Sequence, residues 1–241
     1  MCKSIKCIDI IQGLRGMGLG AGDGVMVHSS LSSMGYVDGG AATVVDAFLE
    51  VVGDQGTLMV PTFTHSNTEY FDPLNSPSKN GAITEAVRKR SGAIRSLHPT
   101  HAVTVIGSEV EGLVGKDLEH GALGQGCALH RLIDRGGLVF LLGVDHQANS
   151  VIHIGEDLAG DDRHRHFSPE NPKRVTVKHP RDGEIVVTLT SMMGHTTAFD
   201  EMDGFLRSRG QVVEGRIGDA ECQLMKGVDV VKATVDILGS L

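Results

Sequence analysis

Apolar residues are distributed along the chain in two patterns, short continuous runs and a spacing of three or four positions. Four apolar runs, each short enough for a buried strand, stand at 25–27, 57–60, 102–106 and 138–144. Between these runs, apolar residues recur every three or four positions, which is typical of amphipathic helices. Such helices are expected at 5–17, 43–52, 81–89, 128–135, 196–209 and 228–238, with two more that begin at Ser108 or Glu109 and at Asn149 or Ser150.

Strands that alternate with helices predict a sheet that carries helices on both faces. The fold class expected is therefore α/β, a three-layer α/β/α sandwich around a mixed sheet, in one domain over residues 1–241. Two further strands, 174–177 and 184–190, flank a turn and predict a peripheral β-hairpin, which suggests that the sheet is mixed. Residues 62–78 show little periodicity and predict a long loop, and residues 215–219 predict a polar turn.

Composition narrows the class of protein. The chain has 241 residues and is 40% hydrophobic, which is enough for a substantial core. A formal charge of −8, with two tyrosines, seven phenylalanines and no tryptophan, disfavours a nucleic-acid partner. We expect no membrane partner and a cytoplasmic location, because no run approaches the roughly 20 apolar residues of a spanning helix and no signal-peptide pattern opens the chain. The four cysteines lack CxxC spacing, which argues against a disulfide framework.

The residues that follow the apolar run 138–144 form the densest candidate site. His153 is expected in the first turn of a helix, with Glu156 three positions on and on the same face. Imidazole is suited to act as a base near neutral pH, and a neighbouring carboxylate orients the ring and raises its basicity. Solvated polar residues behind a strand would give the same local pattern. Zinc ranks lower, because His146 and His153 fit no usual ligand set, so no metal is expected.

Two other segments have the chemistry to hold an anion. Residues 28–31, His-Ser-Ser-Leu, come directly after the apolar run 25–27, and small polar residues at a strand's carboxyl end can cradle a phosphate or an oxyanion. The segment 95–101 offers Arg95 and hydroxyls that can clamp phosphate oxygens, while Pro99 fixes its backbone. Helix capping explains the first pattern and a surface ion pair the second equally well, since neither has the glycines of a phosphate-binding loop.

Five motifs, taken in order, resemble the aminoglycoside 3-N-acetyltransferase family. Their order and spacing make the match far more specific than any one motif, and it covers residues 5–160 closely. The motifs are HSSLSSMG from residue 28 with GGA from 39, GTLMVPTFT from 56, FDP from 71 with SP from 76, RSLHPTHAV from 95, and LLGVDHQANSVIHIGE from 141.

The resemblance implies an acetyl-CoA-dependent N-acetyltransferase with an α/β/α fold, whose partners are coenzyme A and an amine of an aminoglycoside. A homodimer is one assembly that the sequence allows. The resemblance also implies that His153 is a general base with Glu156 as its partner, and that backbone N–H groups near Ser29 and Ser30 stabilise the tetrahedral oxyanion. Cofactor binding is implied for His28, Ser29, Ser30, Leu31, Arg95, Ser96, His98, Thr100 and Val103, and substrate binding for Thr64, Glu69, Asp72 and Asp145.

Three functions stay open at this point. The first is acetyl transfer to an aminoglycoside amine. The second keeps the fold and the coenzyme A site but has a different small amine as acceptor, because Asn67, Lys178 and His179 stand where members of the family have acidic residues. Glu69 and Asp72 are candidate replacements for the first of these positions. The third is a non-catalytic acyl-CoA-binding protein or a histidine-based metal hydrolase.

Overall fold

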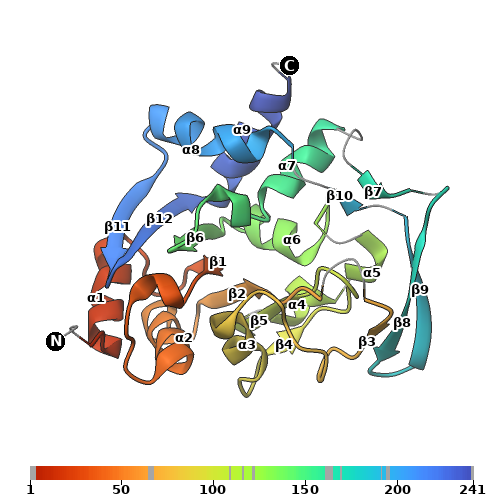
Figure 1. Cartoon of the computed structure of the whole chain (residues 1–241), viewed down its shortest axis with the longest axis horizontal. Coiled ribbons are helices and arrows are strands. Elements are labelled where there is room, and N and C mark those ends of the chain that lie inside the picture. The colour runs from red at the N-terminus through yellow and green to blue at the C-terminus, as the bar shows by residue number, and fades with distance from the viewer. Residues whose placement is uncertain are drawn as a thin grey trace.

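A seven-stranded sheet forms the centre of the computed structural model (Figure 1), with the strand order β11-β12-β6-β1-β2-β5-β4. The structure describes residues 4–64, 68–108, 110–115, 117–120, 123–160, 165–168, 170–190, 192–193 and 196–239. The strands of this sheet are β1 (Gly24–Ser29), β2 (Thr57–Pro61), β4 (Ile94–Arg95), β5 (Val103–Gly107), β6 (Leu138–Leu142), β11 (Val213–Ile217) and β12 (Ala220–Lys226).

The sheet is mixed because only its centre is parallel. β1 runs parallel to β2 and β6, whereas the outer strands on both sides are antiparallel to their neighbours. This confirms the predicted α/β fold with a mixed sheet. The polar turn predicted at 215–219 is wrong, because most of it belongs to β11, which forms an antiparallel hairpin with β12. β11 is an edge strand in which only Ile217 is buried, so it lacks the alternation that marks a strand in sequence.

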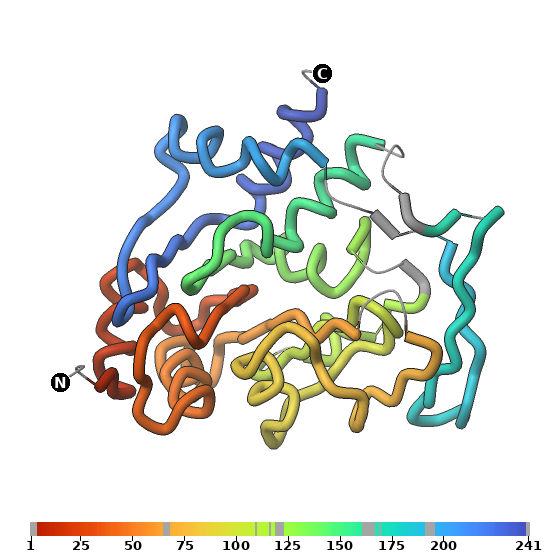
Figure 2. The backbone as a smooth tube through the Cα atoms, viewed as in Figure 1, coloured from red at the N-terminus to blue at the C-terminus, as the bar shows by residue number. Residues whose placement is uncertain are grey.

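Helices cover both faces of the sheet (Figures 1 and 2), as expected for three layers. The predicted helices are present, with ends shifted by at most three residues. One face packs against α1 (Cys7–Gly16), α2 (Gly40–Val52) and α3 (Ala82–Arg88). The other packs against α4 (Val110–Val114), α6 (Ala128–Asp134), α7 (Ile152–Ala159), α8 (Ala198–Ser208) and α9 (Gly227–Gly239), and the chain also has α5 (Asp117–His120).

The predicted hairpin forms a small sheet of its own. β8 (Lys173–His179) and β9 (Gly183–Leu189) pair antiparallel, and β3 (Tyr70–Phe71) adds a parallel strand to β8. The loop predicted at 62–78 therefore contains a strand that the sequence did not indicate, and the hairpin is not what makes the main sheet mixed. β7 (Arg165–Phe167) pairs with β10 (Met192–Met193). Of the charged stretch 161–166, residues 161–164 lie outside the described residues.

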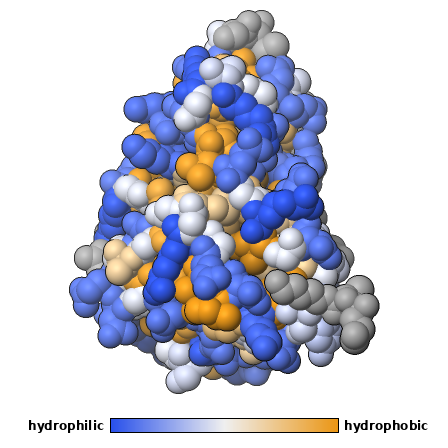
Figure 3. All heavy atoms as spheres, turned by 90° about the vertical axis from the view of Figure 1, so that its left-hand side faces the viewer, coloured by the Kyte–Doolittle hydropathy of each residue, from blue (hydrophilic) through white to orange (hydrophobic). Residues whose placement is uncertain are grey.

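The strands that carry the candidate site are buried along their length. Four consecutive side chains of β6, from Val139 to Leu142, have no exposed surface, as expected for an apolar strand with helices on both faces. By contrast, the outer surface over α1 and β11 is mostly hydrophilic with small apolar areas (Figure 3). Among the described residues, no helix is long and apolar enough to span a bilayer.

Helix α7 lies tightly against the last helix, α9. A Cβ atom built on Gly155 would lie 2.3 Å from Thr234 Cβ, far inside van der Waals contact. Thr234 is fully buried, and its hydroxyl donates to the carbonyl of Val230 at 2.9 Å. The position of α7 therefore depends on a glycine at the point where the two helices meet.

Candidate active site

Three imidazoles gather where β1 and β6 end. The two strands are parallel neighbours, with His28 beside Leu141 in register, so their carboxyl ends reach the same edge of the sheet. β6 leads into a short 3-10 turn, η2 (His146–Ala148), and then into α7, which carries His153. Burial and the nearby rings of His146 and His153 lower the pKa of His28 to about 3. The fold thus brings His28 next to His146 and His153, which come from a much later part of the chain.

His153 and Glu156 form a buried hydrogen-bonded pair on α7. His153 Nδ1 lies 2.6 Å from Glu156 Oε2, and the two side chains are 10% and 0% exposed. An ionised carboxylate can only accept, so Nδ1 carries the proton of the bond and the lone pair of the neutral ring is on Nε2. The predicted pairing of His153 with Glu156 is confirmed, whereas their catalytic role stays a prediction.

The start of α8 closes over this pair. The Thr196 N–H donates to Glu156 Oε1 at 3.2 Å, so each carboxylate oxygen has a partner. The ring of Phe199 lies 5.1 Å from the ring of His153, measured between centroids, at an angle of 57°. The pair is therefore held between two helices that lie about 40 residues apart in the chain.

The other two rings at this edge are neutral. Burial lowers the pKa of His146 as well as that of His28. His28 Nε2 accepts from the Ser150 N–H at 3.3 Å, and the amide of Asn149 lies 3.2 Å from His146 Nδ1. Because an amide nitrogen only donates, both accepting ring nitrogens lack a proton. Within the described part of the chain, no cluster of three or more His, Cys, Asp or Glu side chains is placed to hold a metal ion.

A cavity of about 580 Å³ opens on the opposite side of the end of β1. Side chains alternate along a strand, so Ser29 points away from His28 and lines this cavity. Ser29 Oγ is buried without a hydrogen-bond partner. The cavity is lined by residues 29–32, 35–37, 40, 81 and 82, which include three serine hydroxyls and the first residue of α2. It brings together Ser29, Ser30 and Leu31, as the sequence predicted for a cofactor site, but not His28.

The backbone of Ser30 is not available to an oxyanion. Its N–H donates to the carbonyl of Leu142 at 2.9 Å, which extends the pairing of β1 and β6 by one residue. The Ser30 N–H is therefore already used, and stabilisation of an oxyanion by the other backbone N–H groups near Ser29 and Ser30 stays a prediction. The Ser33 hydroxyl lies 2.9 Å from both Ser30 Oγ and the carbonyl of Gly143, so it links the two strand ends.

Comparison with known proteins agrees with this geometry. The family model for aminoglycoside 3-N-acetyltransferases matches residues 26–239. The chain belongs to this family. The chain is also 32% identical over 248 residues to aminoglycoside N(3)-acetyltransferase VII of Streptomyces paromomycinus, which covers 90% of this chain and 86% of the relative. These findings confirm the predicted family and the predicted class of enzyme, an acyltransferase of the aminoglycoside N(3)-acetyltransferase type.

Solved structures of the family share the fold. The crystal structure of aminoglycoside acetyltransferase AAC(3)-Xa is 28% identical, with a TM-score of 0.87 over 97% of this chain and 92% of that chain. The structure of AAC-IIIb in a binary complex with CoASH is 23% identical, with a TM-score of 0.85 over 99% and 97% of the two chains. The fold of this chain is thus shared with these two solved structures.

In this member of the family, Arg95 points into the protein. Its guanidinium donates to the carbonyl of Ser76 at 2.5 Å and to that of Thr62, and it lies 4.8 Å from the ring centroid of Phe71. Burial lowers the pKa of Arg95 to about 10. The structure places this side chain as a brace of the loop 62–78, and its contact with a cofactor stays a prediction.

The rest of the segment 95–101 is buried as well. Ser96 exchanges two hydrogen bonds with Val103, from N–H to carbonyl at 2.8 Å and from the Val103 N–H to Ser96 Oγ at 3.1 Å. His98 Nδ1 accepts from the His101 N–H at 3.1 Å, while its Nε2 is buried without a partner. Burial lowers the pKa of His98 to about 3. Thr100 is fully buried too, so these residues support β5 from inside the fold.

The predicted substrate residues of the loop 62–78 do not meet His153 through any described contact. Thr64 donates to the carbonyl of Pro99 at 2.5 Å and is buried, whereas Glu69 is exposed. Asn67, where family members have an acidic residue, lies outside the described residues. Substrate binding by this loop therefore stays a prediction.

Asp72 is engaged within the protein. Its Oδ1 accepts from the Leu74 N–H at 2.9 Å, and its Oδ2 lies 2.9 Å from Lys178 Nζ and 2.8 Å from the amide of Asn75. Burial alone would raise the pKa of Asp72, but the hydrogen bonds from Asn75 and Lys178 outweigh it and lower the pKa to about 2. Asp72, the candidate acidic replacement in the loop, and Lys178 on β8, which stands where family members have an acidic residue, thus neutralise each other.

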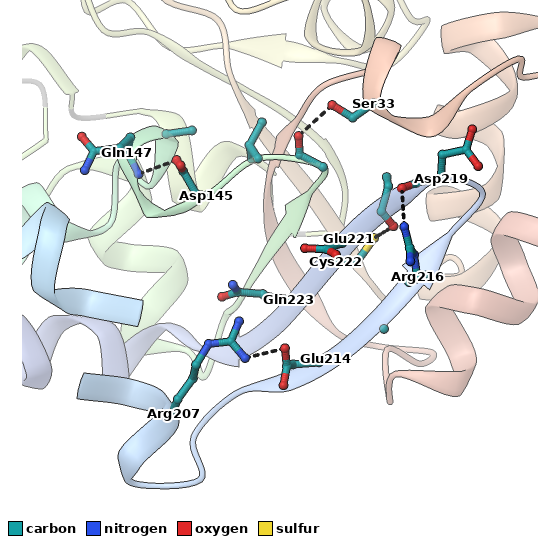
Figure 4. Close-up of a pocket in the computed structure, with 15 residues that line it drawn as sticks. Ser33, Asp145, Gln147, Arg207, Glu214, Arg216, Asp219, Glu221, Cys222 and Gln223 are labelled. Carbon is teal, nitrogen blue, oxygen red and sulfur yellow. Dashed lines mark hydrogen bonds and ion pairs between the residues drawn. The ribbon is translucent and has the colours of Figure 1, made fainter. Parts of the chain in front are cut away.

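Asp145 belongs to a second cavity, of about 970 Å³, between the end of β6 and the β11–β12 hairpin (Figure 4). Its Oδ1 accepts from the Gln147 N–H at 3.0 Å and so starts the turn η2. Sequence reasoning missed the rest of this cavity, because the hairpin comes from a distant part of the chain and was predicted as a turn. Its charged lining consists of Asp145, Glu214, Asp219 and Glu221, against Arg207 and Arg216.

Proposed function

We propose that this protein transfers an acetyl group from acetyl-CoA to an amine of an aminoglycoside, with His153 as the general base. The observation that carries the proposal is the buried pair of His153 and Glu156 in a chain of this family. An ammonium group has no lone pair, so the acceptor must lose a proton for its nitrogen to attack. His153 Nε2 takes that proton, and the free amine then attacks the thioester carbonyl carbon to form the C–N bond. As the C–S bond breaks, the nitrogen loses a second proton to the departing thiolate, which leaves as CoASH. Glu156 stabilises the imidazolium that results.

Acetyl-CoA supplies the thioester carbonyl that the amine attacks. The relative AAC-IIIb binds CoASH. In this chain, the cavity at the end of β1 has the chemistry for a phosphate group, since Ser29 Oγ lacks a partner and the helix α2 begins at the cavity wall. We assign cofactor contact to residues 29–31 at this cavity. His28, Arg95, Ser96, His98, Thr100 and Val103 are assigned to hold the strand ends from inside.

The acceptor is expected to be a polycation. The relative AAC(3)-IVa was solved in complex with a gentamicin. The second cavity, around Asp145, is lined by four carboxylates and two guanidinium groups. The guanidinium of Arg207 is already paired with Asp203 and Glu214. An acidic excess attracts amines that carry positive charge. We therefore propose that this second cavity, next to η2, holds those amines of the acceptor that are not acetylated.

A second acceptor class is favoured by one contact. Lys178 occupies the carboxylate of Asp72, which removes negative charge from the loop 62–78. A site with less negative charge suits a smaller amine with fewer positive groups. The fold, the cofactor cavity and the role of His153 are the same in this alternative.

The experiment that separates the two acceptor classes is an assay of thiol release from acetyl-CoA. A panel of aminoglycosides is compared with monoamines of similar size, each with and without protein. Release that depends on an aminoglycoside supports the proposal. Turnover of monoamines only, by protein that binds acetyl-CoA, favours the second acceptor class, and binding without any turnover overturns both.

A further inference from the structure

The segment from Thr196 to Phe199, which leads into α8 and includes its first two residues, touches the His153–Glu156 pair at two points. The Thr196 N–H donates to Glu156 Oε1, the carboxylate oxygen that His153 does not use. The Phe199 ring packs on the imidazole with 5.1 Å between centroids, and Phe199 is only 3% exposed. One short segment therefore contacts both the carboxylate and the ring.

This segment is itself fixed in place. Thr196 Oγ1 accepts from the Ala198 N–H at 3.3 Å, and the Thr196 carbonyl accepts from the Phe199 N–H at 3.2 Å, so both groups of Thr196 bind the start of α8. One turn later, Asp200 Oδ1 accepts from the Gln147 side chain at 2.9 Å, which ties α8 to the turn η2. The direction of the Thr196 N–H is thus set by the helix start.

The two contacts restrict different motions of the base. A carboxylate that is bonded at one oxygen can still swing about its own axis, and the Thr196 N–H at the other oxygen removes that freedom. The plane of Glu156 sets the direction of the bond to His153 Nδ1 and hence the direction in which Nε2 points. The face of the imidazole that meets Phe199 cannot tilt without overlap with a buried ring.

We propose that Thr196 and Phe199 are positioning residues for His153, which act through Glu156 and through the imidazole ring. The effect of these two residues on catalysis rests on the proposed function. Their effect on the orientation of the His153 ring does not. Displacement of a catalytic group by about 1 Å can lower the rate by about a hundredfold.

The test compares variants at α8 with a matched variant elsewhere in the core. Phe199→Leu removes the ring, and Phe199→Met is a second variant that fills more of the volume. Thr196→Val removes the hydroxyl that accepts from the Ala198 N–H and keeps the shape, while Thr196→Ser keeps a hydroxyl at this position. Phe48→Leu is the control, because Phe48 is 1% exposed and packs on Phe140 at 5.5 Å in the core of the opposite face.

The first measurement needs no substrate. The proton in the 2.6 Å bond between His153 and Glu156 is expected to give a far-downfield N–H signal in the proton NMR spectrum, which is absent from His153→Gln. We expect this signal to shift or broaden in both Phe199 variants and in Thr196→Val, and to keep its position in Thr196→Ser and Phe48→Leu. With an active acceptor, kcat should fall about tenfold in the same three variants, while KM for acetyl-CoA stays within about twofold.

The outcomes separate this inference from the proposed function. A signal that keeps the wild-type position in folded Phe199→Met and Thr196→Val, or that is missing from the wild-type protein, overturns the positioning role whether or not any amine is acetylated. Loss of the signal in all three variants without acetylation of any amine supports the positioning role and overturns the proposed function instead. An equal change in Phe48→Leu would show a general effect on packing and also overturn the inference.

Discussion

The two parts of the candidate site are built in opposite ways. At the ends of β1 and β6, buried neutral rings surround His153, and Glu156 has a partner on each oxygen. At the loop 62–78 and β8, the polar groups are charged, and Lys178 is 51% exposed on its side-chain surface. A buried, fully bonded pair keeps one geometry, whereas a charge pair at the surface can be exchanged at little cost in stability. Under the proposed function, the first part carries the chemistry, and in the second part Lys178 changes the charge of the loop 62–78.

Removal of the base should have the largest effect. His153→Ala is expected to lower kcat by about 100-fold to 10,000-fold, because it removes the imidazole that we propose takes the proton of the amine. Calorimetry should show that acetyl-CoA still binds, since the cavity proposed for the cofactor lies on the other side of β1. His130→Gln is the control, because His130 forms a similar pair with Asp134 at 3.5 Å on α6. Equal kcat in His153→Ala and the wild type would end the assignment of the base.

Glu156→Gln should have the next largest effect. Both neighbours of this side chain, His153 Nδ1 and the Thr196 N–H, are donors, and glutamine offers only one accepting oxygen. One donor must then face an NH₂ group, or the imidazole must move its proton to Nε2, where it can no longer act as a base. We expect kcat to fall on the order of 100-fold, with KM for acetyl-CoA unchanged. Asp157→Asn, one residue along α7, should keep nearly full activity, and an equal loss there would contradict this account.

The two parts should also respond differently to acid. His28 and His98 have pKa values of about 3 in the folded protein and about 6.5 when unfolded, so the unfolded chain binds more protons below pH 6.5. The free energy of unfolding should therefore fall as pH drops from 6.5 towards 3, on the order of 2 kcal/mol for each ring at pH 5.

The pKa of Asp72 is lowered to about 2, so its contribution is present above its unfolded pKa of about 3.9 and is lost only as pH falls towards 2. Urea unfolding at pH 7, 5 and 4 tests this order of events. A free energy of unfolding that stays constant between pH 7 and 5 would show that the rings are protonated in the native state.

The smallest effect is expected at the ion pair on β8. Lys178→Gln releases the carboxylate of Asp72 and should lower KM for a polycationic acceptor by less than about tenfold, more at low salt than at high salt. Lys173→Gln removes the same charge from the same strand without a described ion pair, and it is the control. KM for acetyl-CoA should not change in either variant. An equal fall in KM in both variants would show that the net charge of the protein, and not the release of Asp72, causes the change.

The central fold and the pairing of His153 with Glu156 followed from local patterns in the sequence. The apolar run at 138–144 becomes β6, and a spacing of three on a helix is enough to bring His153 and Glu156 together. The contacts that the sequence could not indicate join distant positions. β12 pairs with β6, Asp72 meets Lys178 from 106 positions away, and the Ser30 N–H is used by Leu142. Such contacts depend on how elements are arranged in space, which no short window of sequence contains.

The position of β6 between β1 and β12 has a consequence for the newly made protein. A ribosome delivers β1, β6 and α7 well before β12 and α9, and domains begin to fold from the N-terminal side during synthesis. Until residues 220–239 emerge, β6 has one unpaired edge and Gly155 has no Thr234 to pack against. The growing chain therefore contains His153 and Glu156 long before β12 and α9 are present to hold β6 and α7 in place. Activity should appear only after the last helix leaves the ribosome.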